Sequence, residues 1–419
     1  MVGGRVVMDT PSATAVPPGM RMRRQPRTQR LVPRRRLLGP DPLLVSLVVA
    51  LGTVGAFTIY AAAYGLNGTV SARSYLLKDL LNLAIGLVLS VLVAAVDYRR
   101  LRFYGPVGYV AVLVALLAVL SPLGTTVNGA HAWFNFGGGF QLEPSEFAKP
   151  VVIVLLAAIL SRRHAAASRP GWRDVLLALG LAALPLLLIA AEPALGISIV
   201  LAVVIMVALS VAGVHRAWLI GLALVTVLGA GAVFQLHLLK PYQQARFTSF
   251  LHPQNDTSGV AYQTQQSITA IGAGGLTGEG FLRGSQTNGR FVPEQQTDFA
   301  FTVVAEETGL AGSATVLALL CGLSLRALGI ARGATDRFGS VIAAGVGCWF
   351  AAQTFINVGM TLGLMPVTGI PLPFVSYGGS AMFCNLIGVG LVLSVARGSG
   401  SARGPHMVSV FARSPAGPS

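Results

Sequence analysis

Long apolar runs alternate with short polar segments along most of the chain, and this pattern predicts membrane-spanning helices. A run of about 20 apolar residues is long enough to cross the hydrocarbon core of a bilayer. An isolated strand cannot satisfy its backbone hydrogen bonds in lipid, so we expect each run to be a helix. The ten runs lie near residues 42–64, 77–96, 104–121, 145–160, 175–191, 195–213, 217–237, 299–325, 338–361 and 379–396. The sequence therefore predicts an all-α polytopic membrane protein with about ten transmembrane helices.

The composition excludes a soluble globular protein. Of the 419 residues, 53% are hydrophobic and only 11% are charged, whereas soluble domains have about 25% charged residues. Too few polar side chains remain to cover the surface of a soluble protein of this size. The three cysteines all lie in apolar segments, so we expect them to pack as small hydrophobic residues rather than form disulfides or bind metal.

The net charge of +15 would suggest a nucleic-acid partner, but the distribution of the basic residues argues against one. Nine arginines lie before residue 40, in a segment with little apolar content. We therefore predict that residues 1–40 are a basic, disordered cytoplasmic tail. Such a tail sets the topology and contacts anionic membrane lipids, and no nucleic acid is expected to bind.

Placing this tail in the cytoplasm puts most of the 30 lysines and arginines on the same side of the membrane. That asymmetry favours an even number of spans with both termini cytoplasmic. The predicted organisation is a tail at 1–40, a ten-helix membrane domain at 41–397 and a second cytoplasmic tail at 398–419. The longest loop, about 238–298, is then extracytoplasmic, and a loop of this length is usually functional. We therefore expect any chemistry at the outer face.

Several ordered motifs give the chain a resemblance to a known family. They are Asn128-Gly129-Ala130 with Trp133, Pro144-Ser145-Glu146-Phe147-Ala148-Lys149, Pro293-Glu294-Gln295-Gln296-Thr297-Asp298-Phe299, and the run from Met365 to Ser380. By these motifs the chain is identified as a member of the SEDS family (shape, elongation, division and sporulation). Thr368 stands where the FtsW branch usually has a lysine, so the last run resembles the RodA branch instead.

The resemblance implies a peptidoglycan glycosyltransferase of the bacterial cytoplasmic membrane. Such an enzyme polymerises lipid II into glycan strands at the outer face during cell elongation and cell-shape maintenance. The implied partners are lipid II, membrane lipids and a class B penicillin-binding protein, the transpeptidase that crosslinks the glycan. No cofactor is certain, and a divalent cation, Mg²⁺ or Mn²⁺, is left open with no ligands assigned. Two other functions also stay open: a lipid II flippase, and a non-catalytic scaffold of the elongation or division machinery.

Glycosyl transfer requires a base for the attacking hydroxyl and positive charge or hydrogen-bond donors for the departing pyrophosphate. Asp298 lies where the long outer loop enters the eighth span, and the resemblance makes it the catalytic residue. From its position alone, the same residue more simply caps the helix that follows. Glu146 and Lys149 are three residues apart near the outer end of the fourth span, hence on one helix face. They are either an anchoring ion pair or substrate-binding residues.

Further substrate-binding residues are predicted to be Arg246, Trp133, Tyr262, Glu294, Ser376 and Tyr377. The arginine is the best loop cation for a sugar or phosphate contact, although it could instead pair with Asp256. The tryptophan and Tyr262 either stack on sugar rings or anchor the protein at the membrane interface. In the eighth span, one of Glu306 and Glu307 is expected to face the bundle interior and to form hydrogen bonds with polar residues of another span, such as Gln353 or Asn357.

The chain departs from the family pattern at several positions. Glu143 and Glu192 stand where the family has the glutamines of its Q-P-S-E and Q-P-D-L-G motifs, and Ala194 occupies the acidic position of the second motif. Gln296 replaces a common histidine, and Ala132 replaces a usual arginine. These departures disfavour a mechanism that needs a histidine near the catalytic aspartate or a carboxylate at position 194.

Overall fold

The computed structural model describes residues 41–67, 69–127, 130–137, 140–162, 170–192, 194–235, 241–251 and 259–401. All of them belong to the second of the chain's two compact units, Leu37–Ser419. The predicted N-terminal tail, the Asn128-Gly129 pair, Asp256 and most of the predicted C-terminal tail lie outside the described residues.

Each of the ten apolar runs forms a helix, as the sequence predicts. The helices are α1 (Pro42–Asn67), α2 (Thr69–Ala95), α3 (Leu101–Leu120), α4 (Pro144–Leu160), α5 (Trp172–Ala191), α6 (Leu195–Val211), α7 (Arg216–Gln235), α11 (Ala300–Gly333), α12 (Arg337–Thr361) and α13 (Gly379–Ser401). Within the described ranges, seven of them, α1, α2, α3, α5, α11, α12 and α13, are long and apolar enough to cross a membrane. The helical membrane fold is thus confirmed. The count of ten spans stays a prediction, because α4 and α6 have only 17 residues each.

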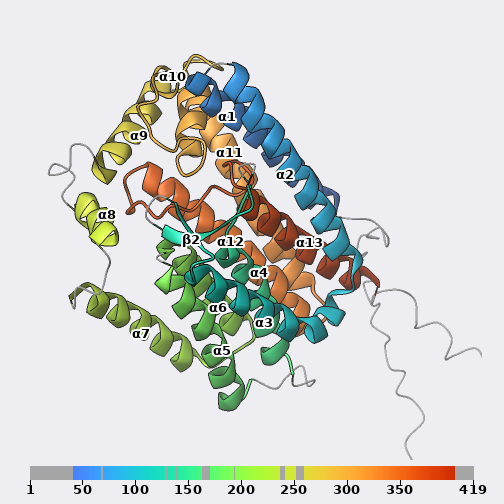
Figure 1. Cartoon of the computed structure of the whole chain (residues 1–419). Helices are drawn as coiled ribbons and strands as arrows, with labels where there is room; N and C mark the ends of the chain where they lie inside the picture. The colour runs from blue at the N-terminus through green and yellow to red at the C-terminus, as the bar shows by residue number, and fades with distance from the viewer. Residues whose placement is uncertain are drawn as a thin grey trace, which may run out of the picture. The chain divides into compact units, whose positions relative to one another are not determined.

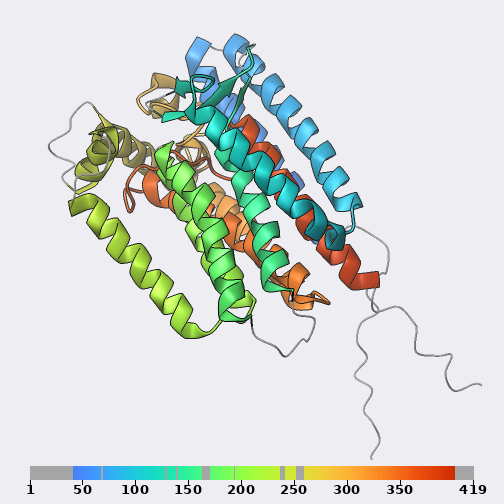
Figure 2. The same ribbon diagram turned by 60° about the horizontal axis from the view of Figure 1, so that its bottom comes forward.

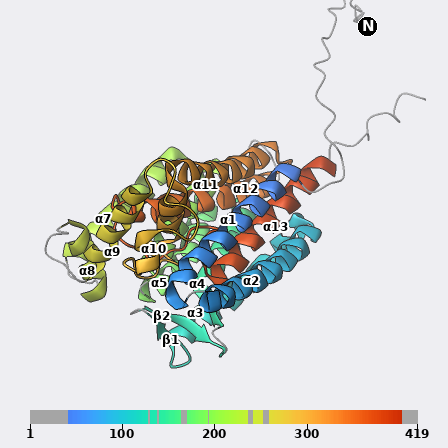
Figure 3. The same cartoon turned by 90° about the horizontal axis from the view of Figure 1, so that it is seen from above.

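The helices α12 and α13 form the centre of the bundle. Within an apolar stretch of 18 residues in each spanning helix, 72% of the stretch is buried in α12 and 78% in α13. In the other five spanning helices at most 39% of this stretch is buried. Along its length α13 packs against α2, while α12 packs against α11, α6 and α4 (Figures 1 and 2). The helices α7, α8 and α9 lie at one edge of the bundle and α2 at the opposite edge (Figure 3). The less buried helices therefore present apolar faces to the lipid.

Two polar segments connect the helices on the side of the bundle that carries the predicted chemistry. Between α3 and α4, the strands β1 (Thr125–Val127), β2 (Ala130–Asn135) and β3 (Gln141–Leu142) pair antiparallel in the order β1-β2-β3. Between α7 and α11, the predicted long loop contains α8 (Pro241–Leu251), α9 (Val260–Gly274) and the short α10 (Ser285–Gly289) (Figure 1). The loop is therefore largely helical where it is described, and its location outside the membrane stays a prediction.

The helix α11 is interrupted at Gly309, which has φ 67° and ψ −162°. A positive φ carries no steric penalty in glycine. The interruption leaves backbone groups that bond to the segment after α9. The N–H groups of Glu279 and Gly280 donate to carbonyls in α11 at 2.9 and 3.0 Å, and the Leu310 N–H donates to the Gly275 carbonyl at 2.9 Å. The outer part of α11 and this segment therefore share backbone hydrogen bonds.

Two carboxylates of α11 reinforce this attachment. Glu306 accepts hydrogen bonds from the Gln286 N–H at 2.6 Å, from the Thr287 N–H at 3.0 Å and from the Thr287 hydroxyl at 2.6 Å. Glu307 accepts from the Leu282 N–H at 3.0 Å. The expectation that one of these carboxylates bonds to the amide side chains of α12 is wrong. Glu306 instead binds N–H groups at the start of α10, and Glu307 binds the N–H of Leu282 in the preceding segment. Carboxylates bind such N–H groups strongly.

Candidate active site

A tight turn from Pro293 to Phe299 carries Asp298 to the start of α11. The carbonyl of Glu294 accepts the N–H groups of Thr297, Asp298 and Phe299 at 3.1, 3.1 and 3.3 Å. Glu294 has a positive φ of 51°, a backbone conformation that costs a residue with a side chain about 1–3 kcal/mol. Its carboxylate also accepts the Thr297 hydroxyl at 3.1 Å. The predicted substrate residue Glu294 therefore shapes the turn that presents Asp298.

Asp298 does not occupy the N-cap position of α11. The cap residue is Phe299, which makes no side-chain cap hydrogen bond. The backbone carbonyl of Asp298 accepts the Asn357 side-chain amide at 2.8 Å, and this contact fixes the turn to α12. The capping interpretation of Asp298 is therefore not favoured by the structure.

Asp298 and Arg246 meet at Gly369. A Cβ atom on this glycine would lie 3.5 Å from Asp298 Oδ2 and 3.5 Å from a terminal nitrogen of Arg246. The glycine has a φ of 72°, so a residue with a side chain would be strained at this position. Burial raises the pKa of Asp298 to about 6, the nearby Arg246 partly opposes this shift, and Glu294 adds to it. A cation from α8 and a carboxylate from the turn before α11 thus converge on one point.

Lys149 lies in a buried network on α4. Its Nζ atom is 2.9 Å from Glu146 Oε2, and both side chains are 1% exposed. The ammonium group also donates to Gln353 Oε1 at 3.0 Å and lies 4.7 Å from the centre of the Trp349 ring. The predicted ion pair is therefore present within α4, and the contacts of Lys149 with Gln353 and Trp349 join α4 to α12. A substrate contact of these two residues stays a prediction.

The irregular segment between α12 and α13 links the two clusters. Asn357 and Gln353 donate to the carbonyls of Ile370 and Pro371, each at 2.8 Å. The Ser376 hydroxyl accepts the Leu372 N–H at 2.8 Å, so this predicted site residue stabilises the fold of the segment. These contacts hold Gly369 in place between Asp298 and Arg246.

Tyr377 connects this segment to two other elements. Its N–H donates to the Gln296 carbonyl at 2.8 Å, within the turn that carries Asp298. Its ring packs edge-on against Tyr75 of α2 with ring centres 5.2 Å apart. The structure thus brings Tyr377 next to the predicted active site, while its contact with substrate stays a prediction.

The two remaining predicted residues lie on separate elements. Trp133 is half-buried in β2, where its carbonyl accepts the Thr125 hydroxyl at 3.0 Å. Tyr262 is half-buried in the first turn of α9. Neither has a contact with Asp298 among those identified for the described residues, and their contact with substrate stays a prediction.

Sequence reasoning did not assign several residues that build this region. Gln353 and Asn357 are fully buried amides on α12, and Gly369 is the point at which the charged groups meet. The sequence did contain a signal for the two amides: Gln353 and Asn357 are four residues apart in an apolar span and therefore lie on one helix face. Glu143 and Glu192 were noted only as departures from the family pattern, yet they lie in one cluster with Glu146 and Lys149 (α4), as their mutual electrostatic influence shows.

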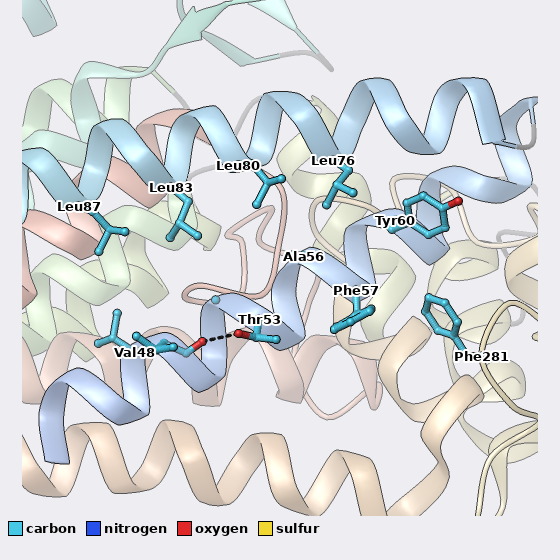
Figure 4. A pocket seen from close by; sticks show the side chains of 12 residues that line it. Val48, Thr53, Ala56, Phe57, Tyr60, Leu76, Leu80, Leu83, Leu87 and Phe281 are labelled. Carbon is cyan, nitrogen blue, oxygen red and sulfur yellow. Dashed lines mark hydrogen bonds between the residues drawn. The ribbon is translucent and has the colours of Figure 1, made fainter. Parts of the chain in front are cut away.

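An apolar groove of about 540 Å³ runs between α1 and α2 (Figure 4). Leu76, Leu80, Leu83 and Leu87 line it from α2, facing α1. Phe281 from the outer segment packs against Phe57 and Tyr60 of α1, with ring centres 5.8 and 6.4 Å apart. The Thr53 hydroxyl donates to the carbonyl of Val49 at 2.8 Å and so adds no unpaired polar group. The groove therefore offers an almost wholly apolar surface.

The groove and the Asp298 turn are joined through α1. The side-chain amide of Gln295 donates to the Ala62 carbonyl at 2.8 Å, just beyond the aromatic end of the groove. No group of three or more His, Cys, Asp or Glu side chains placed to hold a metal ion occurs in the part of the chain that the structure describes. The divalent cation left open by the sequence therefore stays untested.

Residues 41–400 match a protein family described as "Cell cycle protein" and named for FtsW, RodA and SpoVE. The chain belongs to this family. Peptidoglycan glycosyltransferase MrdB of Escherichia coli K12 is 36% identical over 356 residues, which cover 85% of this chain and 93% of the relative. Stage V sporulation protein E of Bacillus subtilis 168 is 36% identical over 363 residues, which cover 85% of this chain and 97% of the relative.

Solved structures of the family have the same fold. One is a chain from a peptidoglycan synthase complex described as coordinating polymerization and crosslinking, with a TM-score of 0.71 and 31% identity over 86% of this chain and 99% of that one. Another is Rod shape determining protein RodA from Thermus thermophilus, with a TM-score of 0.62 and 29% identity over 86% of this chain and 97% of that one. The predicted SEDS membership is confirmed, and this SEDS chain is a multi-pass protein of the bacterial cytoplasmic membrane.

Proposed function

We propose that this SEDS protein is a peptidoglycan glycosyltransferase that polymerises lipid II at the outer face of the membrane during cell elongation. The observation that carries the proposal is the convergence of Asp298 and Arg246 on Gly369. The relatives named peptidoglycan glycosyltransferase support the enzyme class, and the similarity to RodA supports a role in cell shape.

Asp298 acts as the general base in the proposed reaction. It takes the proton from the acceptor hydroxyl while that oxygen attacks the anomeric carbon of the donor sugar. The bond to the pyrophosphate breaks, and the pyrophosphate leaves with the bonding electron pair. Because burial raises the pKa of Asp298 to about 6, the carboxylate is a stronger base than an exposed aspartate and is still mostly ionised at neutral pH.

Arg246 supplies positive charge for the departing pyrophosphate. It lies on α8, beside Asp298 and against Gly369, whose lack of a side chain leaves room near both groups. Preorganised cations at a developing anion lower the barrier most where water is excluded. The pair therefore provides both functions that glycosyl transfer requires.

The groove between α1 and α2 holds the polyprenyl chain of the substrate in this proposal. It runs along two spanning helices and its lining residues carry no charge, so an apolar chain is the ligand that suits it. The bond from Gln295 to the Ala62 carbonyl ties its aromatic end to the turn of Asp298. A chain in the groove thus directs its pyrophosphate end toward the catalytic carboxylate.

A class B penicillin-binding protein is the proposed partner that crosslinks the glycan product. The similarity to a chain of a peptidoglycan synthase complex supports a partner of this kind. The resemblance to the family points to α11 and α12 as contact helices. Both present exposed apolar side chains to the membrane, with Leu310 60%, Leu325 61% and Phe355 70% exposed.

The test is polymerisation of purified lipid II by the full chain in complex with its partner. Asp298→Asn keeps the size of the side chain but removes its charge and basicity. We expect glycan synthesis to fall by about 100-fold to 10,000-fold, the usual contribution of a general base, while the variant still inserts and binds its partner.

The matched control is Asp336→Asn, the same change at the N-cap of α12, where the side chain accepts the Gly339 N–H at 2.8 Å. Asparagine caps about as well as aspartate, so this variant should polymerise at the wild-type rate. Wild-type polymerisation by a well-folded Asp298→Asn protein would instead defeat the catalytic assignment and favour the flippase or scaffold functions.

A further inference from the structure

The two glutamates that replace family glutamines lie together in the structure. Glu143 directly precedes α4 and Glu192 directly follows α5. Ser145 joins them, because its hydroxyl donates to Glu143 Oε1 at 2.9 Å and also lies against the carboxyl group of Glu192. Two departures that are far apart in the sequence thus form one pair beside the candidate active site.

Glu192 has no solvent contact and no fixed hydrogen-bond donor. Its side chain is 0% exposed, and neither carboxylate oxygen receives a hydrogen bond from any part of the chain that the structure describes. The nearby Ser145 hydroxyl gives its proton to Glu143 instead. An ionised carboxylate in such a place is strongly disfavoured. A protonated carboxyl group needs only an acceptor, and the Ser145 oxygen is available for that role.

The charges around the pair lead to the same conclusion. Glu143 faces Glu146 and Lys149 of α4, Asp298 of the turn before α11 and the Cys384 thiol of α13. The lysine forms its ion pair with Glu146.

Asp298, in turn, faces Arg246. Each cation of the cluster therefore has a carboxylate partner other than the pair, and ionisation of both Glu143 and Glu192 would leave two uncompensated negative charges. Burial, reinforced by neighbouring carboxylates, raises the pKa of each to about 8.

We propose that Glu143 and Glu192, bridged by Ser145, are a protonated carboxyl pair at neutral pH and switch the active site off when they lose their protons. The inference rests on the proposed function for its activity readout. The pair acts through its neighbours: while it is neutral, Lys149 keeps its ion pair with Glu146. After ionisation, two further anions compete for Lys149 and repel the anionic pyrophosphate of the substrate.

The test compares pH profiles of lipid II polymerisation for the wild type and the double variant Glu143→Gln with Glu192→Gln. Glutamine has the size of a protonated glutamate and cannot ionise. We expect the double variant to work within about threefold of wild type at pH 7. At pH 9 the wild type should lose about tenfold or more, because two sites with pKa values about 8 are then mostly deprotonated, while the double variant keeps its rate.

Two outcomes would overturn the inference. One is an alkaline loss of activity that is unchanged in the double variant. The other is a collapse of activity at pH 7 in a well-folded double variant, because the reaction would then need the negative charges. The control is Glu279→Gln, at a loop carboxylate that accepts bonds from Ser285, and it should leave the profile as in wild type.

Infrared spectroscopy separates failure of the pair from failure of the proposed function. A protonated buried carboxyl group has a C=O stretching band that an ionised carboxylate lacks. Other buried carboxyl groups contribute to this band in both proteins, so the measured quantity is the difference between wild type and the double variant. At pH 7 the wild type should show the stronger band, and the difference should disappear on titration to pH 9.5. Equal bands at pH 7 would refute the protonated pair even if polymerisation is observed, and a stronger wild-type band would support the pair even if no glycan is made.

Discussion

At the scale of single residues, the site depends on amide side chains that bind backbone carbonyls. Asn357 donates to the carbonyls of Asp298 and Ile370, at 2.8 Å in each case. Gln353, one turn earlier on α12, accepts from Lys149 and donates to the Pro371 carbonyl. Asn357 thus fixes the turn of Asp298, the proposed base, and Gln353 fixes the adjacent segment after α12.

The change Asn357→Asp tests this dependence. It preserves the shape but removes both donated protons and sets carboxylate oxygens against two carbonyls. Leaving buried acceptors unpaired costs about 1–3 kcal/mol, so polymerisation should fall about tenfold or more. The rate of glycan formation is the measurement. Asn288→Asp, at an exposed residue that donates to the Leu282 carbonyl, should change it less than twofold, and equal effects of the two changes would contradict the role of Asn357.

The pH dependence of the reaction tests the environment of Asp298. A base works only when deprotonated, so activity should rise from pH 5 to pH 7 with a midpoint near the pKa of Asp298, about 6. Arg246 lowers this pKa, and Arg246→Gln should therefore move the midpoint to higher pH, whatever it does to the maximal rate. Arg283→Gln, at an exposed loop residue, serves as the control. A midpoint that stays in place or moves down in Arg246→Gln would be inconsistent with the charge pair.

At the scale of elements, helices were predictable from sequence and their contacts were not. The ten apolar runs form helices because a helix satisfies its backbone hydrogen bonds within its own segment, as the lipid environment requires. The motif match assigned both Asp298 and Arg246 to the site, but it did not predict that they meet at Gly369. The partners of Glu306 and Glu307 were predicted wrongly, because the break at Gly309 and the docking of the outer segment depend on long-range packing. The proximity of Glu143 to Glu192 also depends on long-range packing and could not be predicted from the sequence.

The attachment of α10 to α11 is a testable property of these elements. Thr287→Val removes the hydroxyl that donates to Glu306 at 2.6 Å and leaves a buried carboxylate short of one donor. The local opening free energy should fall by about 1–3 kcal/mol, which hydrogen exchange of amides 285–289 would detect as about tenfold or greater acceleration. Thr269→Val is the control, since that exposed hydroxyl bonds only within its own helix in the described structure. Unchanged exchange in Thr287→Val would show that the carboxylate does not hold α10.

At the scale of the whole molecule, the distribution of charge and the positions of the polar segments point to one outer face. The helices α8 to α10 and the three-stranded sheet adjoin the same ends of the spanning helices (Figures 1 and 3). The turn of Asp298 directly precedes α11 and follows α10 in the chain. The basic residues that set the topology lie at the opposite ends or in the tails. The side of the membrane is a prediction from these charges.

Cysteine labelling of intact cells tests that orientation. In a background without the three native cysteines, Thr277→Cys of the outer segment should react with a membrane-impermeant reagent. Arg332→Cys, at the far end of α11, should react only after the membrane is permeabilised. Both positions are exposed, so burial does not explain a failure to react. Labelling of position 332 but not of 277 in intact cells would invert the predicted topology.

The shared backbone bonds at Gly309 have a mechanical consequence. The carbonyls of Glu306 and Glu307 are occupied by N–H groups from the segment after α9, and beyond the break the Leu310 N–H donates to Gly275 of the same segment. That segment therefore splints α11 across the break at Gly309 and makes its two parts move together. Loss of these bonds would let the turn of Asp298 shift relative to the rest of α11.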